Sequence, residues 1–261
     1  MTAPEPDQNG LFQPVIEICA TGGDVILVCE HACNAFPAPW GDLGLSGAER
    51  QAHIAWDPGA LGLMRGLARR LGATTVHATV SRLIYDCNRA PDMAGAMPAR
   101  SETFAVPGNA AISAAERAAR TAAIYVPFHA GLHALIVQRI ALGRRPVVIT
   151  IHSFTPVYFG QRRDVEFGVI HDADPALART ILAEAEARGG LVCGLNAPYS
   201  AADDVTHTLR LQATPYGLAN AMLEIRNDLI ASPAAEEAMA ERLAPALSAA
   251  IAALTATAKA G

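Results

Sequence analysis

The fold is indicated most strongly by the stretch Pro146-Val-Val-Ile-Thr-Ile151, which is followed directly by His152 and Ser153. It is a short, continuous run of mainly β-branched residues, typical of a strand buried on both faces of a parallel sheet. A similar run, Val25-Ile-Leu-Val28, follows the turn signal Thr21-Gly-Gly-Asp24. We therefore expect both runs among the inner strands of one sheet.

In the rest of the chain, segments with strand periodicity alternate with segments with helix periodicity. Further strands are expected at 75–80, 82–85, 165–170 and 219–225, and helices at 59–71, 113–142 (interrupted at Pro127), 175–188 and about 233–257. This alternation predicts an α/β fold, a three-layer αβα sandwich with a mixed, largely parallel sheet. We expect a single domain over residues 1–261, with about residues 1–12 as a flexible extension.

Composition excludes several classes of protein. The chain has 261 residues, of which 51% are hydrophobic and 17% charged, so it can bury a sizeable core. A net charge of −5 argues against nucleic-acid binding, and no apolar run is long enough to predict a membrane span. Five cysteines without a CxxC pattern suit a reducing compartment, so we expect a cytoplasmic protein.

Polar residues gather where the expected strands end. Glu30 and His31 follow the first run, and His152 and Ser153 follow the run at 147–151. Asp86, Asn88 and Arg89 follow residues 82–85, and Glu224 and Arg226 alternate with apolar residues near 225. Ligands of open α/β sheets bind at the carboxyl ends of strands. Four strands are therefore expected to bring these groups to one edge.

The residue types at this edge complement one another chemically. Two imidazoles and a carboxylate suit Zn²⁺, which in catalytic sites takes three protein ligands. A second carboxylate can act as general base, and Arg with Asn suits a substrate carboxylate. Each residue alone also has a structural interpretation, for example Glu224 and Arg226 as an exposed ion pair. No HExxH is present, so a zinc site of that helical type is excluded.

These segments resemble the N-formylglutamate amidohydrolase family from about residue 25 to 230. The resemblance is carried by Cys29-Glu-His-Ala-Cys-Asn34 with Pro37, His53-Ile-Ala-Trp-Asp57, Ser81-Arg-Leu-Ile-Tyr-Asp-Cys-Asn-Arg89 with Pro91-Asp92, Pro127-Phe-His129, Ile151-His-Ser153, Asn196-Ala-Pro-Tyr-Ser200 and Leu223-Glu-Ile-Arg-Asn-Asp-Leu-Ile230. The ordered set is specific, although no single motif is. The family is distantly similar to zinc carboxypeptidases and aspartoacylases, which implies a zinc-carboxypeptidase-like (phosphorylase/hydrolase-like) sandwich.

The resemblance implies that His31 and His152 are ligands of one zinc ion, or of another divalent metal. Carboxypeptidase-like sites place the third ligand where this chain has Asn34, so the nearest carboxylates are Glu30 and Asp57. If strand geometry persists through Glu30 and His31, their side chains point to opposite faces, which favours Asp57. Asp57 could instead cap a helix that has Pro58 at its first position.

The resemblance also implies roles in catalysis and substrate binding. Glu224 is the expected general base, and His129 either contacts the oxyanion or substrate or is a core histidine. Asn88 and Arg89 are expected to hold the carboxylate of the amino acid. A second substrate carboxylate needs a second cation, for which Arg82 and Arg226 are the candidates. Tyr199 is either a pocket residue or a turn aromatic.

The expected activity is zinc-dependent hydrolysis of N-formyl-L-glutamate to formate and L-glutamate, as in histidine degradation. Alternatives are a related hydrolase of another N-acyl amino acid or peptide, and a non-catalytic dicarboxylate-binding protein. The expected partner is a small anionic N-acyl amino acid rather than a nucleic acid or membrane, and the protein is expected to be a monomer or homo-oligomer.

Overall fold

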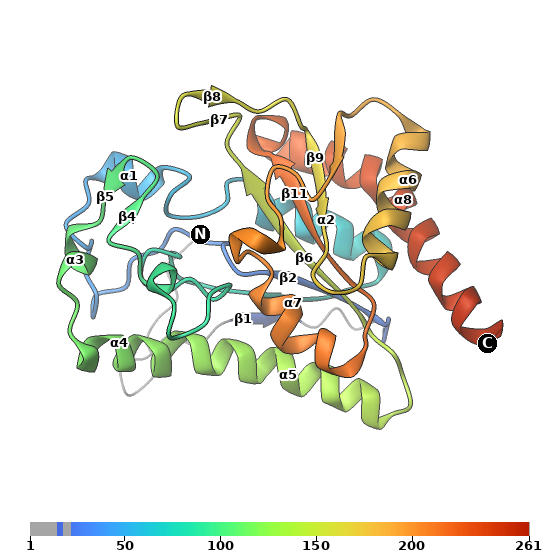
Figure 1. Ribbon diagram of the computed structural model, residues 1–261, viewed down its shortest axis with the longest axis horizontal. Coiled ribbons are helices and arrows are strands. Elements are labelled where there is room, and N and C mark those ends of the chain that lie inside the picture. Colours follow the sequence, from blue (N-terminus) through green and yellow to red (C-terminus); the bar gives the residue numbers. More distant parts are fainter. Residues whose placement is uncertain (1–14, 18–21, 261) are drawn as a thin grey trace.

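A seven-stranded sheet lies at the centre of the structure, a computed structural model that describes residues 15–17 and 22–260 (Figure 1). In spatial order, the strands are β1 (Val15–Glu17), β3 (Thr74–His77), β2 (Val25–Cys29), β6 (Val147–Phe154), β11 (Asn220–Arg226), β9 (Phe167–Ile170) and β10 (Cys193–Leu195). Strands β3, β2, β6 and β11 are parallel to one another, whereas β1 and the β9–β10 pair run in the opposite direction. The predicted mixed, largely parallel α/β sheet is confirmed.

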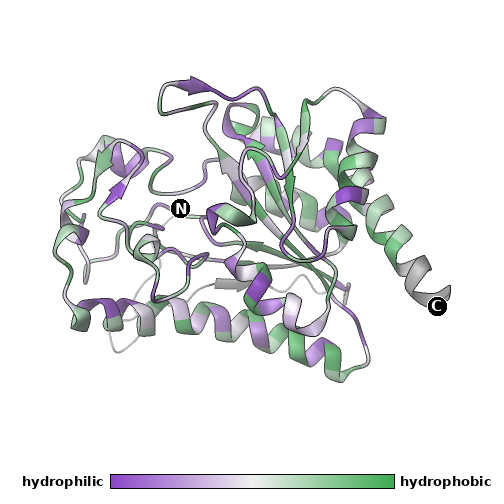
Figure 2. Cartoon of the chain, viewed as in Figure 1, coloured by the Kyte–Doolittle hydropathy of each residue, from purple (hydrophilic) through white to green (hydrophobic). Residues whose placement is uncertain are grey.

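Helices cover both faces of this sheet. One face packs against α2 (Ala60–Leu71), α6 (Ala176–Arg188) and α8 (Pro233–Ala260), and the other against α5 (Val126–Ala141) and α7 (His207–Gln212). Successive strand residues point to opposite faces, so Leu27 belongs to the first core and Ile26 to the second. Figure 2 shows the resulting pattern, with apolar strands between helices whose surfaces change from apolar to polar.

The start of α2 determines where Asp57 lies. The helix begins at Ala60 behind Gly59, whose φ of 80° is easily adopted only by glycine. A Cβ on Gly59 would meet the carbonyl oxygen of Ile230 at 2.2 Å, so the close approach also requires glycine. Asp57 is therefore not the cap residue, and its carboxylate is free to face the sheet edge.

The predicted helix at 113–142 is nearly continuous. Ser113 caps α4 (Ala114–Arg120) by accepting a hydrogen bond from the backbone of Glu116, as its sequence pattern indicates. A π-helical turn, η2 (Thr121–Tyr125), then leads into α5. The interruption expected at Pro127 takes this form because a proline lacks the N–H group that the regular helix would use.

Short elements occupy the connections. They are α1 (Gly47–Gln51), η1 (Ala94–Ala96), the hairpin of β4 (Arg100–Ser101) and β5 (Phe104–Ala105), α3 (Pro107–Ala110), the hairpin of β7 (Val157–Tyr158) and β8 (Gln161–Arg162), η3 (Ala201–Asp203), η4 (Thr214–Tyr216) and η5 (Asn227–Ile230). The two hairpins matter most here, because both border the cavity described below.

One strand prediction is wrong. Residues 82–85 form a turn, because the Ser81 hydroxyl donates to the Ala55 carbonyl at 2.8 Å and the Ser81 carbonyl accepts from Ile84 at 3.0 Å. Among the described residues, no helix is long and apolar enough to cross a membrane. The expected flexible extension at residues 1–12 lies outside the described residues, and the single domain stays a prediction.

Candidate metal centre and active site

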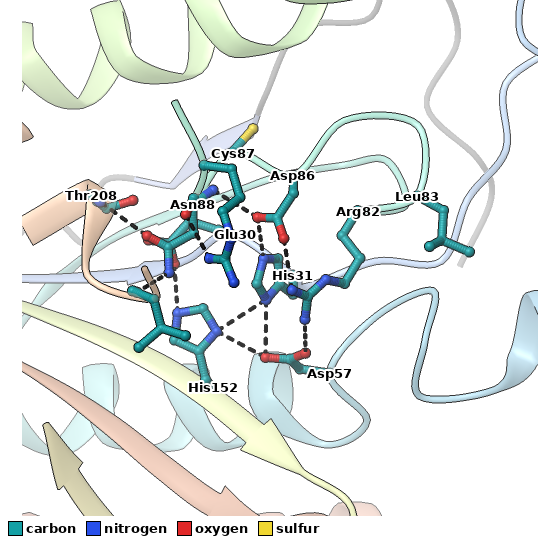
Figure 3. Close-up of polar contacts among 12 residues, drawn as sticks. Glu30, His31, Asp57, Arg82, Leu83, Asp86, Cys87, Asn88, His152 and Thr208 are labelled. Carbon is teal, nitrogen blue, oxygen red and sulfur yellow. Dashed lines mark hydrogen bonds and ion pairs between the residues drawn. The ribbon is translucent and has the colours of Figure 1, made fainter. Parts of the chain in front are cut away.

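Three donor atoms converge at the carboxyl end of the parallel strands. His152 Nδ1 lies 2.9 Å from Asp57 Oδ2 and 3.1 Å from His31 Nδ1, and the His31 and Asp57 atoms are 3.3 Å apart (Figure 3). Ligands at 2.0–2.2 Å from a tetrahedral Zn²⁺ are separated by about 3.3–3.6 Å. These three side chains, the ligand triad, are buried, and their donor atoms lie at or slightly below that separation, close enough together to share one metal ion.

Each member of the triad comes from a different part of the fold. His31 follows β2, His152 lies in β6, and Asp57 precedes α2. The Asp57 backbone N–H donates to the His31 carbonyl at 2.9 Å, and the Ser153 N–H donates to Asp57 Oδ2 at 3.2 Å. Backbone contacts therefore hold the carboxylate beside both histidines.

The other ring nitrogen of each histidine faces a carboxylate. His31 Nε2 lies 2.7 Å from Asp86 Oδ1, and His152 Nε2 makes an ion-pair contact of 3.1 Å with Glu30 Oε2. Histidine ligands of metals commonly donate their second N–H to a carboxylate, which fixes the ring and its tautomer. This arrangement leaves both Nδ1 atoms as the donors for a metal, and it gives Glu30 a supporting position instead of a place in the triad.

The pKa shifts follow from this packing of opposite charges. Burial opposes ionisation of Asp57, but His31 and His152 hold the pKa of its carboxyl well below the ordinary value. Burial likewise opposes ionisation of Asp86, and Arg82 and His31 hold the pKa of that carboxyl well below the ordinary value. Burial opposes protonation of His152, yet Glu30 and Asp57 raise its pKa well above the usual range. Without a metal the site is therefore strongly attractive to a positive charge, and its donor set fits Zn²⁺.

Glu224 lies beside the triad on the neighbouring strand. It pairs with His152 in the parallel β11–β6 register, so both side chains point to the same face. Its carboxylate is buried, its Oε2 has no hydrogen-bond partner, and burial raises its pKa to about 7. A buried carboxyl with a free oxygen and a pKa near neutrality is suited to accept and return a proton.

A cavity of about 310 Å³ opens in front of the triad and Glu224. Arg82, Asn88 and Arg89 line it, as expected for substrate-binding residues. The guanidinium of Arg82 binds Asp57 Oδ1 at 3.3 Å and Asp86 Oδ2 at 2.7 Å, as Figure 3 shows. Arg82 thus supports the ligand triad as well as facing the cavity.

Asn88 and Arg89 differ in how much of their side chains is free. The Asn88 side chain donates to the Val205 carbonyl and accepts from the Thr208 N–H at 3.0 Å, so its amide anchors the first turn of α7 and the residues just before it. Arg89 donates to the Asn88 carbonyl at 2.9 Å and makes no ion pair with any described residue. Of this pair, Arg89 is the group available to an anion.

Two hairpins meet at the border of the cavity. Glu102, between β4 and β5, lies 2.8 Å from His53 Nε2 and accepts a hydrogen bond of 2.9 Å from the backbone of Phe159, between β7 and β8. His53, Glu102 and Tyr158 all line the cavity. Residues of both hairpins therefore form part of the cavity wall.

Two expected site residues lie elsewhere. His129 is buried outside the cavity lining, where its Nε2 donates to the Cys87 carbonyl at 2.8 Å and its Nδ1 accepts from Gln212 at 3.2 Å. This place matches the core histidine alternative. Arg226 also lies outside the lining, because Asp228 at 2.8 Å and Glu166 at 3.2 Å hold its guanidinium.

The structure gives Asp86 a role that the sequence did not assign, and it places Glu30, a candidate third ligand, against the outer nitrogen of His152. Asp86 and Glu30 orient the triad histidines, but their place within the site depends on contacts between distant segments. Tyr199 lines the cavity, which decides between its two expected positions. The only sequence signal for Glu30 and Asp86 was their position next to chemically active neighbours, which does not distinguish a ligand from its support.

Comparisons with known proteins agree with this geometry. The family model described as N-formylglutamate amidohydrolase matches residues 23–231. The chain belongs to this family. It is therefore an amide-bond hydrolase, and the family expected from the sequence motifs is confirmed.

Solved structures show the same fold. The gene product Atu2144 of Agrobacterium tumefaciens is 47% identical with a TM-score of 0.92, over 97% of this chain and all of that one. An N-formylglutamate amidohydrolase from Ralstonia eutropha JMP134 is 18% identical with a TM-score of 0.65, over 91% of this chain and 97% of that one. No significant match to a curated protein was found.

Proposed function

We propose that this member of the family is a zinc-dependent hydrolase that converts N-formyl-L-glutamate to formate and L-glutamate. The observation that carries the proposal is the convergence of His31, Asp57 and His152 within 3.3 Å of one another, with Glu224 beside them. With this substrate the reaction would belong to histidine breakdown in the cytoplasm, as expected from the resemblance.

The triad would hold the metal through the two Nδ1 atoms and Asp57 Oδ2. A Zn²⁺ ion bound there would polarise the amide carbonyl and lower the pKa of a water molecule. Glu30 and Asp86 keep the imidazole rings in the orientation that presents Nδ1. The chain thus supplies both the ligands and their alignment.

Glu224 performs the proton transfers in the proposed reaction. Its free Oε2 accepts a proton as a water molecule adds to the amide carbon, and returns it to nitrogen as the C–N bond breaks. A carboxyl whose pKa is raised toward 7 by burial can carry out both steps near neutral pH. A bound cation would lower that value, so activity is expected to fall on the acid side.

The cavity orients the substrate. Arg89 binds the α-carboxylate through its guanidinium, which makes no ion pair with a described residue. The side-chain hydrogen bonds of Asn88 hold the backbone next to Arg89 in place. Arg82 places positive charge next to the reacting carbonyl while it holds Asp57 and Asp86. Positioning and charge together would act on the amide bond.

Metal analysis combined with a substrate screen tests the proposal. Zinc should be stoichiometric in the purified protein, and N-formyl-L-glutamate should be cleaved faster than N-acetyl and N-succinyl amino acids. Preference for another acyl group would shift the substrate within the same chemistry. Zinc-free protein that binds dicarboxylates without turnover would instead support a binding protein.

A variant of the base tests the mechanism. Glu224→Gln should lower turnover by about 100- to 10,000-fold and leave zinc bound, because Glu224 is outside the triad. Glu241→Gln, an exposed change in α8, is the matched control and should retain full activity. Substantial hydrolysis by Glu224→Gln would remove Glu224 from the role of base.

A further inference from the structure

The segment of residues 81–98 carries several polar groups beside the ligand triad. It includes Arg82 and Asp86, and the Asp86 carboxylate lies 2.7 Å from His31 Nε2 (Figure 3). Apart from the short turn η1, this segment contains no regular helix or strand. The hydrogen bonds of a sheet or a helix therefore do not fix its path, and other contacts must hold it in place.

A buried pair of side chains, Arg120 and Asn109, holds this segment near both of its ends. Arg120 Nη1 donates to Asn109 Oδ1 at 2.8 Å and to the Ile84 carbonyl at 3.3 Å. Asn109 Nδ2 donates to the Leu83 carbonyl at 2.8 Å and to the Pro98 carbonyl at 3.0 Å. Both Arg120 and Asn109 are only 3% exposed, so water does not compete for these bonds. We call this pair the buried hub.

The carbonyls that the hub binds lie close to Asp86 in the structure of the segment. The Asp86 N–H donates to the Ala96 carbonyl at 2.8 Å, which joins the two halves of the segment next to the hub. Asp86 Oδ1 accepts from the Asn88 N–H at 2.9 Å and faces His31 Nε2. A shift of the backbone at the hub is therefore expected to move the carboxylate that orients the His31 ring.

The position of Arg120 calls for a side chain with several donors. Arg120 is the last residue of α4, and the π-helical turn η2, a type of turn that is frequent at functional sites, follows it directly. Its Nε pairs with Glu116 Oε1 at 2.8 Å, which compensates the buried charge. An apolar residue would leave the Asn109 and Ile84 oxygens without this donor, and a buried acceptor without a partner is costly.

We propose that Arg120 is a positioning residue for the metal centre. Together with Asn109 it fixes the 81–98 segment, and in that position Asp86 orients the ring of His31. The inference rests on the proposed function, because it concerns the same metal site. Arg120 lies outside the cavity lining, so it acts through the segment and not on the substrate.

Two buried arginines of the same helical stretch provide a matched pair. Arg139 in α5 is 8% exposed, and its Nη2 donates to Thr74 Oγ1, on β3, at 2.6 Å. Neither Arg139 nor Thr74 lines the cavity. Arg120→Met and Arg139→Met each remove a buried cation, so both should lower the free energy of unfolding measured in urea. Only Arg120→Met releases the hub.

Competition between the zinc-loaded full chain and a chelator measures the expected effect. Arg120→Met should weaken zinc binding about 10-fold and lower kcat/KM by about the same factor, whereas Arg139→Met should leave the zinc affinity unchanged. Partial recovery in Arg120→Lys, which keeps the charge without the planar fork, would support the inference. A zinc affinity of Arg120→Met equal to that of wild type, or equal losses in both methionine variants, would overturn it.

A second variant of the hub decides the question if Arg120→Met does not fold. Asn109→Leu removes the donors to the Leu83 and Pro98 carbonyls but leaves the charge of Arg120 in place. It should also weaken zinc binding about 10-fold. A folded Asn109→Leu chain that binds zinc as tightly as wild type would contradict the positioning role.

Hydrogen exchange tests the inference separately from the proposed function. In the metal-free full chain, the Asp86 amide should exchange about 10-fold faster in Arg120→Met than in Arg139→Met, because only the first variant loosens the 81–98 segment. Equal exchange in the two variants would overturn the inference. Faster exchange in a protein that binds no zinc would contradict the proposed function and still support the positioning of Asp86 by Arg120.

Discussion

Two clusters of histidines lie in this protein, one fully buried and one partly buried, and they differ in their acidic neighbours. The ligand triad is surrounded by carboxylates, with Glu30 and Asp86 on the outer ring nitrogens. A second cluster, the aromatic histidine cluster, consists of Tyr125, His129 and His207. The Tyr125 hydroxyl lies 2.9 Å from His207 Nε2, and its ring centre lies 4.4 Å from that of His129. No carboxylate forms an ion pair with either of these histidines in the described chain.

His129 and His152 are both deeply buried, yet their pKa values shift in opposite directions. Burial lowers the pKa of His129 to about 4, and it also lowers that of His207. His152 is as deeply buried, but Glu30 and Asp57 raise its pKa. Desolvation alone thus makes a neutral, structural histidine, whereas carboxylates on several sides make a site that attracts cations.

The largest difference between the clusters should appear on loss of a metal ligand. Asp57→Asn removes the anionic donor, so zinc should no longer be stoichiometric by elemental analysis. Turnover should fall about a thousandfold or more, because the metal supplies several kcal/mol of transition-state stabilisation. His207→Gln in the aromatic histidine cluster should retain zinc, and loss of zinc there would contradict the comparison.

The supporting carboxylates should have a smaller effect on the same property. Glu30→Gln and Asp86→Asn leave the three donors in place but weaken their orientation, so zinc affinity should fall about 10- to 100-fold. Competition with a chelator measures this change. Gln212→Leu, which removes the contact to His129 Nδ1, serves as the matched variant in the other cluster. Equal affinities for Glu30→Gln and wild type would show that Glu30 has no orienting role.

The aromatic histidine cluster should make the free energy of unfolding of the protein depend on pH in the acid range. The pKa of His129 is about 4 in the folded protein and about 6.5 when unfolded, so the unfolded chain binds more protons between these values. Stability is therefore lost as pH falls from about 6.5 to 4, by on the order of 3 kcal/mol. Urea unfolding from pH 7 to 4.5 should show a shallower pH dependence for His129→Gln than for wild type. Parallel curves would exclude this contribution.

The smallest expected effect concerns one hydrogen bond. Tyr125→Phe removes the hydroxyl that contacts His207 and should lower the free energy of unfolding by about 1 kcal/mol. Zinc content and turnover should stay unchanged, since the cluster is separate from the cavity lining. A large fall in turnover with unchanged stability would link the two clusters functionally.

Sequence reasoning predicted the local features well. Apolar runs indicated β2, β6 and β11, and the polar residues after them do lie at one edge of the sheet. The third group, Asp86 to Arg89, reaches that edge from a turn instead of a strand, because Ser81 forms hydrogen bonds that end the extended backbone. The spacing of hydrophobic residues in the sequence does not reveal such hydrogen bonds between a side chain and the backbone.

Long-range contacts explain the remaining differences. His129 follows a motif typical of the family, but its role depends on the Cys87 carbonyl and on Gln212, which is 83 residues away. Arg226 is held partly by Asp228, a neighbour visible in the sequence, and partly by Glu166, which is distant. Only the folded chain shows which charges are already neutralised.

The ion pairs around the triad also set its electroneutrality. Three negative charges contact the triad histidines or Arg82, from Asp57, Asp86 and Glu30. The guanidinium of Arg82 contributes one positive charge, so these contacting groups carry a net charge of two negative units. A divalent cation compensates that charge fully, whereas a monovalent or trivalent ion would leave an imbalance in a buried region. In the absence of the ion, the raised pKa of His152 favours its protonated form, so uptake of the metal should release that proton to the solvent.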